Sequence, residues 1–273
     1  MFCKFRPLWA LRGESDMIDT AYTPIDEWSL TSGDDELGAD EAHVWRASLD
    51  QPADVIAELA PLLSQDEYQR AMRYYRPVDR DRFIVGRGIL RNIMSAYLAL
   101  PPGQLRFTYN EYGKPAVSDD QNDRALDFNL SHSAELILCA VASGRVVGID
   151  IEYIREDFAT LEIAEHFFSK DEVTALKSLP TDQRTMGFFN CWSRKEAFIK
   201  AKGMGVSYPL DRFTVSLAPG ELPALLKVDD DEREVARWKM YELKPGAGYA
   251  AAMIVTEPTV TLKQRHWSGR QIT

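Results

Sequence analysis

One helical stretch constrains the fold and the chemistry of this chain more than any other. Residues 188 to 205 read FFNCWSRKEAFIKAKGMG. Trp192, Glu196 and Lys200 recur every fourth residue, so a helix places them along one face. Gly203 follows the last of these turns and is typical of a helix end. By itself the pattern fits an ordinary core helix, whose glutamate–lysine pair contributes about 0.3–0.5 kcal/mol.

A β-branched segment supplies a second and more demanding pattern. Residues 146 to 153 read VVGIDIEY, with Asp150 and Glu152 two positions apart. In a strand that spacing places both carboxylates on one face and the apolar side chains on the other. Two like charges in a hydrophobic strand repel each other and lose hydration, so they require a cation. An arginine could serve, whereas a third carboxylate on a nearby helix would indicate a metal site.

Length and composition exclude several classes of protein. The chain has 273 residues, of which 45% are hydrophobic, and this suits one large domain or two ordinary halves. No segment approaches the roughly 18 consecutive apolar residues of a membrane span. Lys4, Arg6 and Arg12 interrupt the apolar stretch that a secretory signal requires. The three cysteines have neither disulfide nor metal spacing. We therefore expect a cytoplasmic protein with reduced thiols and no membrane partner.

Charge is distributed unevenly along the chain. The net charge of -10 disfavours non-specific binding to nucleic acid or to anionic membranes. Against that average stands a basic band made of Arg70, Arg73, Arg76, Arg80, Arg82, Arg87 and Arg91. Two interpretations stay open: a solvated helix face, or a seat for a phosphorylated small molecule, because guanidinium groups match phosphate geometry.

The expected elements occur in the same order twice. The first series has a strand, helices and three strands, at residues 43–49, 64–75, 79–100, 105–110, 126–131 and 136–142. The second has a strand, three helices and three strands, at residues 146–153, 161–167, 170–179, 181–202, 213–217, 238–243 and 249–255. This order predicts an α+β protein of two similar halves joined near Gly144. The expected divisions are an extended or partly disordered leader, a first half, a second half with the metal site, and a tail, at residues 1–40, 41–144, 145–257 and 258–273.

Five motifs together resemble a known enzyme family. GIDIE and WSRKEAFIKAKG, at residues 148–152 and 192–203, are similar to the two signature motifs of the 4'-phosphopantetheinyl transferases. The similarity is to the larger, surfactin-activating (Sfp-like) type. Supporting matches are GKP, FNLSHS and FFSKDE, at residues 113–115, 128–133 and 167–172. GKP or SHS alone would be a weak signal, whereas five matches in the family's order are specific.

The resemblance implies a fold, a reaction and its partners. It implies a monomer with two halves related by a pseudo-twofold axis. Coenzyme A and Mg²⁺ would bind in the cleft between the halves, and Mn²⁺ is an alternative metal. The enzyme would transfer 4'-phosphopantetheine to a serine of an apo carrier protein and release 3',5'-ADP. Fatty-acid, polyketide and nonribosomal-peptide carriers are all open as substrates.

The chemistry of the implied reaction suggests roles for four charged residues of the two signature motifs. A hydroxyl attacks the β-phosphorus of a diphosphate, so a hard cation must neutralise the developing charge. Asp150, Glu152 and Glu196 offer oxygen ligands for that metal. Glu196 is also the candidate to accept the serine proton, directly or through a metal-bound water. Lys200 is the candidate to contact the same phosphate, and Asp150 and Lys200 are expected among the coenzyme contacts.

The resemblance places further coenzyme contacts in the first half. Arg70, Lys114, Ser131 and His132 match the family's contacts, with the basic residues near the 3'-phosphate. Two other functions use the same residues: a metal-dependent nuclease, and a non-catalytic module that binds coenzyme A or a carrier. The net charge of -10 opposes the nuclease, and the presence of both Glu196 and Lys200 opposes the module.

Overall fold

The protein, described here from a computed structural model, is an α+β protein, as predicted. The structure describes residues 28–30, 36–229 and 231–269. Its α-helices are α1 (Ala53–Leu59), α2 (Gln65–Ala71), α3 (Pro77–Leu98), α4 (Leu161–Phe167), α5 (Lys170–Ser178), α6 (Thr181–Lys202) and α7 (Glu232–Ala236). Its strands are β1 (Ser29–Leu30), β2 (Glu41–Ser48), β3 (Phe107–Tyr109), β4 (Pro115–Val117), β5 (Leu126–Ser133), β6 (Leu136–Ser143), β7 (Val147–Tyr153), β8 (Phe213–Val215), β9 (Leu225–Val228), β10 (Trp238–Leu243), β11 (Tyr249–Thr256) and β12 (Thr261–His266).

Two sheets with related strand orders form the middle of the molecule. One sheet has the order β1-β12-β2-β6-β5, and the other has the order β10-β11-β7. In both, the first strand of the half, β2 or β7, pairs antiparallel with the last, β6 or β11. The remaining long strand, β5 or β10, lies on the other side of that last strand. This shared order agrees with the expectation of two similar halves.

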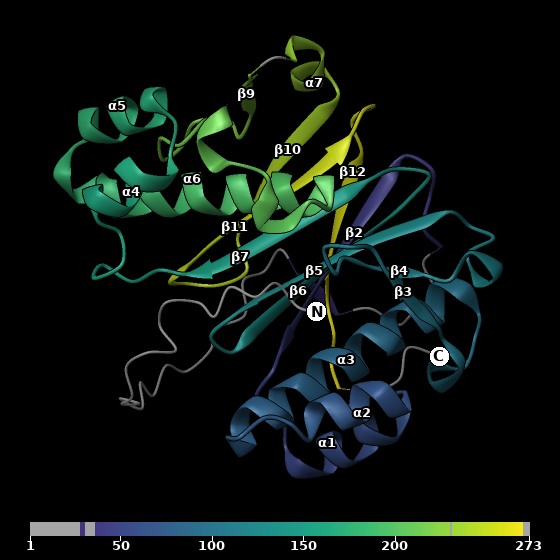
Figure 1. The fold of residues 1–273 in the computed structure, drawn as a ribbon. Helices are drawn as coiled ribbons and strands as arrows, with labels where there is room; N and C mark the ends of the chain where they lie inside the picture. The colour runs from purple at the N-terminus through teal and green to yellow at the C-terminus, as the bar shows by residue number, and fades with distance from the viewer. Residues whose placement is uncertain (1–27, 31–35, 230, 270–273) are drawn as a thin grey trace.

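The two sheets pack face to face between two layers of helices. Figure 1 shows α4, α5 and α6 on the outside of the sheet that contains β7, and α1, α2 and α3 on the far side of the other sheet. A hydrophobic core between the sheets joins the halves and includes Val44, Leu138, Ile149 and Met253. Each helical layer buries a separate core against its own sheet.

The helix α6 lies unusually close to β7, and one glycine makes that approach possible. A Cβ atom on Gly148 would lie 2.1 Å from the carbonyl oxygen of Ala197 and 2.6 Å from the backbone nitrogen of Ala201. Any side chain there would push the helix away. The glycine of GIDIE therefore sets the distance between β7 and α6. The helix ends as predicted, at Gly203, whose φ of 67° closes a left-handed cap.

The two ends of the chain depart from the sequence expectations. Residues 261–266 were expected in a tail but form β12, which lies in the first sheet between β1 and β2 and runs parallel to both. Trp267 is buried directly after it. Most of the expected leader lies outside the described residues, but Trp28 is buried and donates a hydrogen bond to the carbonyl of Lys244. Strand pairing at both ends is long-range, and neither segment carries a local pattern that reveals it.

No helix in the described parts of the chain is long and apolar enough to cross a membrane.

Candidate active site

The predicted carboxylates meet where β7 faces α6. Asp150 is buried, at 2% exposed, whereas Glu152 and Glu196 are half-buried. The ammonium of Lys200, one turn after Glu196, lies 2.6 Å from Asp150 Oδ1. The positive charge of Lys200 also acts on both glutamates, where it favours the ionised carboxylate. The strand pair and the helix face inferred from the sequence therefore do converge on one place.

Negative charge exceeds positive charge at this point, and the pKa values reflect the excess. Burial, followed by the charge of Asp150, raises the pKa of Glu152 to about 8. The same two causes raise the pKa of Glu196 to about 7. Burial opposes the charged form of Lys200, but Asp150, Glu196 and Glu152 outweigh it and raise its pKa. Three carboxylates therefore share the single ammonium group of Lys200.

The donor set suits a hard divalent cation. Asp150 Oδ2 is buried without a hydrogen-bond partner, and an unpaired buried carboxylate oxygen is costly. Oxygen ligands of this kind are those that Mg²⁺ prefers. Among the described residues, no three His, Cys, Asp or Glu side chains are already gathered closely enough to hold a metal. In this conformation Lys200, rather than a third ligand, supplies the contact to Asp150.

Strand β5 brings the SHS residues to the carboxylates. Ser131 Oγ lies 2.9 Å from Asp150 Oδ1 and 2.7 Å from Lys200 Nζ. Ser131 is buried and thus belongs to the carboxylate cluster, whereas its neighbour His132 is exposed. Partial loss of hydration, followed by the charges of Lys200 and Arg82, lowers the pKa of His132. The ring lies near Lys200, as a shared site requires.

The GKP turn reaches across to the end of α6. Lys114 Nζ lies 3.2 Å from Asp127 Oδ2 and 3.3 Å from the carbonyl oxygen of Val147. In the same turn Asn110 donates a hydrogen bond of 2.8 Å to the carbonyl of Gly203. Lys114 therefore lies beside the end of the helix that carries Lys200. The sequence did not single out Asn110, because a bond between residues 93 positions apart leaves no local signal.

The basic band divides into buried and exposed members. Arg91 and Arg87 are buried against Glu67, with shortest distances of 2.7 and 3.4 Å. Arg82 is paired with Asp50. Arg70 is half-buried, with its guanidinium 5.3 Å from the ring centre of Phe83.

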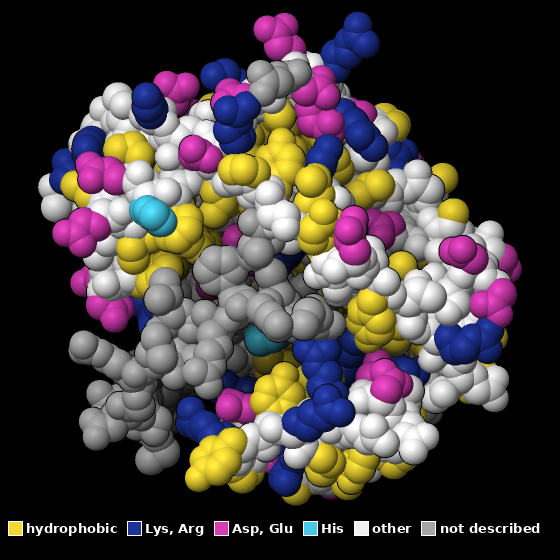
Figure 2. All heavy atoms as spheres, viewed as in Figure 1, with side chains coloured by type: hydrophobic (Ala, Val, Ile, Leu, Met, Phe, Trp, Pro, Cys, Tyr) yellow, Lys and Arg dark blue, Asp and Glu magenta, His cyan; other side chains and the backbone are white. Residues whose placement is uncertain are grey.

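Basic side chains remain at the surface of the first half. Figure 2 shows Lys and Arg side chains, in dark blue, gathered over α2 and α3 with hydrophobic side chains among them. The band is therefore neither wholly a solvated face nor wholly a phosphate seat, since part of it holds the core together.

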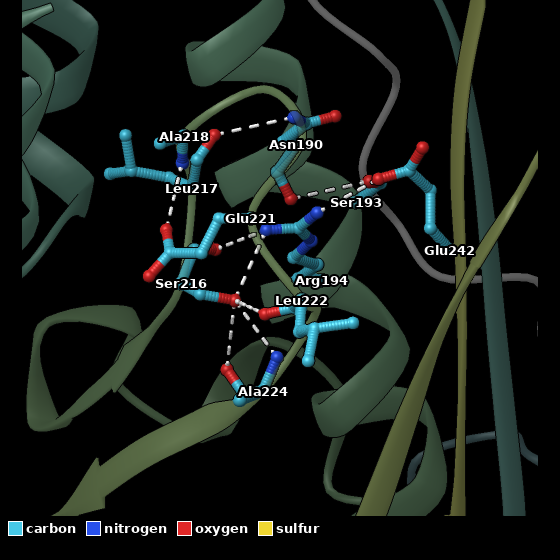
Figure 3. A network of polar contacts seen from close by, with 10 residues as sticks. All are labelled: Asn190, Ser193, Arg194, Ser216, Leu217, Ala218, Glu221, Leu222, Ala224 and Glu242. Atoms are coloured by element: carbon cyan, nitrogen blue, oxygen red, sulfur yellow. Dashed lines mark hydrogen bonds and ion pairs between the residues drawn. The ribbon is translucent and has the colours of Figure 1, made fainter.

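The opposite face of α6 is held by charges that sequence reasoning left without a role. Arg194 is buried and donates to the backbone and hydroxyl oxygens of Ser216, and it pairs with Glu242 at 3.1 Å (Figure 3). Lys195 is buried in an ion pair of 2.8 Å with Glu172. These contacts fix the rotation of the helix, so that Glu196 faces β7.

An aromatic cluster holds the start of the same helix. Trp192 packs in it, with its ring stacked on Phe188 at 5.8 Å between centres. Trp192 is therefore a packing residue, and it does not belong to the polar face of the site.

Comparison with known proteins gives consistent matches along most of the chain. The model of the 4'-phosphopantetheinyl transferase superfamily matches residues 146–254. The model of the 4'-phosphopantetheinyl transferase N-terminal region matches residues 44–144. The two matches are adjacent in the sequence and together cover both halves of the fold.

Individual relatives align over similar lengths. The 4'-phosphopantetheinyl transferase HetI of Nostoc sp. is 43% identical over 219 residues, covering 80% of this chain and 89% of the relative. The 4'-phosphopantetheinyl transferase Sfp of Bacillus subtilis is 36% identical over 197 residues, covering 72% and 83%. A putative 4'-phosphopantetheinyl transferase of Synechocystis sp. is 33% identical, covering 73% and 78%. These matches favour a transferase over a nuclease or a binding module, and the chain belongs to the 4'-phosphopantetheinyl transferases.

Proposed function

We propose that this transferase carries out its reaction where β5, β7 and α6 meet. It moves 4'-phosphopantetheine from coenzyme A to a serine of an apo carrier protein and releases 3',5'-ADP. The observation that carries this proposal is the set of three carboxylates that share the single ammonium of Lys200. Strongly perturbed carboxylates of this kind are typical of catalytic sites.

Asp150, Glu152 and Glu196 would hold a Mg²⁺ or Mn²⁺ ion. The unpartnered Oδ2 of Asp150 and the raised pKa values of both glutamates support this assignment, because each indicates a missing positive charge. When bound, the cation would supply charge neutralisation to the diphosphate and to the leaving group.

Glu196 and Lys200 have separate roles in the transfer. Glu196 lies in the carboxylate cluster on the same helix face as Lys200, and a carboxylate in that place is the candidate to accept the proton of the carrier serine. Lys200 holds its proton firmly, so it acts as a point charge and binds a diphosphate oxygen. Their spacing of one helical turn lets both act on one phosphate. The helix thus presents a base and a cation side by side.

The first half would bind the remote part of coenzyme A. Lys114 lies beside Val147 at the start of β7, and His132 lies within the electrostatic influence of Lys200. We assign both to the 3'-phosphate with Arg70. We also assign Ser131 to the coenzyme site. It is less accessible to the coenzyme than the basic residues, because its hydroxyl is hydrogen-bonded to Asp150 and Lys200. We further propose a monomer, whose two halves are residues 41–144 and 145–257.

Intact-mass analysis tests the reaction and names the carrier class. Purified apo acyl, polyketide and nonribosomal-peptide carriers are incubated with coenzyme A, Mg²⁺ and this protein. We expect at least one class to gain the mass of phosphopantetheine, and excess chelator to prevent the gain until Mg²⁺ or Mn²⁺ is restored. Modification that continues in excess chelator would overturn the metal assignment, and modification of no carrier would overturn the proposal.

A further inference from the structure

A polar side-chain ladder joins β5 to β7. Asp127, Asn129, Ser131 and Ser133 occupy alternate positions of β5, so they lie on one side of the strand. Each accepts a hydrogen bond from a backbone N–H of β7, at Val147, Ile149, Ile151 and Tyr153, over 2.8, 2.9, 3.4 and 2.9 Å. Partner residues are always 20 positions apart.

This ladder replaces the backbone pairing that would otherwise connect the two halves. The strands β5 and β7 belong to different sheets, yet they run in the same direction with a constant offset. A slip of one residue would place Phe128 and Leu130 against the N–H groups, which neither can satisfy. The ladder therefore fixes the register of the second half against the first.

The two serines of the ladder differ from the other two members. Ser131 Oγ lies 2.9 Å from Asp150 Oδ1, and Ser133 Oγ lies 3.2 Å from Glu152 Oε2. A hydroxyl has one proton to donate. Since Ser133 accepts from Tyr153, its own proton is directed to Glu152. Each serine thus contacts the carboxylate next to the N–H group it binds.

We propose that Ser133 is a positioning residue, which orients Glu152 for the metal as Ser131 orients Asp150. The inference rests on the proposed metal site and extends it to the second serine of the SHS motif. Groups that hydrogen-bond a metal-ligating carboxylate fix its orientation, and their loss weakens metal binding. The serines of β5 therefore determine metal affinity from the opposite half of the molecule.

Metal binding without turnover tests this role. Isothermal titration with Mn²⁺ is performed on the wild type and on Ser133→Ala, without coenzyme or carrier. We expect binding about 10-fold weaker in Ser133→Ala, at the lower end of the usual effect of such groups. Ser133→Thr keeps the hydroxyl and should restore the affinity. Ser133→Cys keeps the volume with a weak donor and should resemble Ser133→Ala.

Asn129→Ala is the matched control. It also removes one hydrogen bond of the ladder, but within the described part of the chain Asn129 makes no hydrogen bond to any of the three carboxylates. We expect unchanged Mn²⁺ affinity in this variant despite a lower melting temperature. An equal loss of Mn²⁺ affinity in both alanine variants would overturn the role of Ser133 but not the proposed metal site. Wild-type Mn²⁺ affinity in Ser133→Ala would do the same. A wild type that binds no Mn²⁺ would overturn the proposed metal site and this inference together.

Discussion

The two halves place a long helix on a sheet in similar ways but balance buried charge differently. In the first half, α3 buries Arg87 and Arg91 against the carboxylate of Glu67. In the second half, α6 and β7 place three carboxylates around Lys200. Both helices have 22 residues. The first cluster has a surplus of positive charge within a sealed core, whereas the second has a surplus of negative charge facing the junction of the halves.

The difference separates charges that hold the fold from charges that perform chemistry. Glu67 also caps α2, because its Oε2 accepts from the N–H of Ser64 as well as from Arg91, while its Oε1 lies 3.4 Å from Arg87 Nε. Asp150, by contrast, keeps one buried oxygen without a hydrogen-bond partner. A substitution of Glu by Gln should therefore have opposite effects on stability in the two halves.

The largest expected effect is on activity, at Glu196. Glu196→Gln keeps the size of the side chain but removes its charge and its ability to take a proton. We expect kcat/KM for carrier modification to fall about 10²- to 10⁴-fold, as for loss of a general base. Urea unfolding in chelator at pH 7.5 should show equal or greater stability than the wild type. If Glu196→Gln is inactive because it unfolds, then Glu196 also holds the fold. The contrast between structural charges in the first half and chemical charges in the second would then be wrong.

The pH dependence of the metal-free protein follows from the same carboxylates. The folded pKa values of about 7 for Glu196 and about 8 for Glu152 lie above the ordinary value of 4.5. Between these limits the folded state holds protons that the unfolded state has lost, so stability falls as pH rises from about 5 to 8. The fall should be smaller in Glu196→Gln, and Mg²⁺ should oppose it.

The next effect is on stability, at Glu67 in the first half. Glu67→Gln leaves two buried guanidinium groups without their carboxylate, and breaking a buried ion pair costs about 3–5 kcal/mol. Urea unfolding at 25 °C should show that loss, while the Mn²⁺ affinity of the folded protein stays unchanged. A variant as stable as the wild type would show that the arginines of α3 do not depend on this carboxylate.

The smallest expected effect is on coenzyme selection, at His132. Coenzyme A and its 3'-dephospho form share the diphosphate, so only a remote contact can distinguish them. One charge-assisted hydrogen bond contributes about 1.5–3 kcal/mol, so His132→Ala should lower kcat/KM for coenzyme A about 10- to 150-fold. The value for the dephospho form should barely change. Equal losses for both donors would assign His132 to the carboxylate cluster instead of the 3'-phosphate.

Local patterns predicted the parts of the fold that carry the site. Spacing along one strand indicated the shared face of Asp150 and Glu152, and helical spacing indicated Glu196 and Lys200. The bounds of α6 agree with the expected 181–202. The helix expected to begin at residue 64 is α2, which a capping box of Ser64 and Glu67 opens. These features depend on neighbours within a few residues, which the sequence displays directly.

Features that depend on distant neighbours were missed. The alternating polar residues of β5 were visible, but their partners in β7 belong to another sheet, so their ladder could not be inferred. The ion pair of Glu67 with Arg91 was also missed, because the two residues meet only through the packing of α2 on α3. The strand β12 was missed because its pairing with β2 joins opposite ends of the chain.

The position of β12 makes the order of synthesis matter. His43 on β2 and Arg265 on β12 are 222 residues apart, and they contact each other. At about 5–20 residues per second, a ribosome produces the partner of β2 roughly 10–45 s after β2 itself. During that interval one edge of β2 is open to pairing with another chain. The sheet that begins with β2 is therefore completed only after β12, a strand from beyond the second half, has been made.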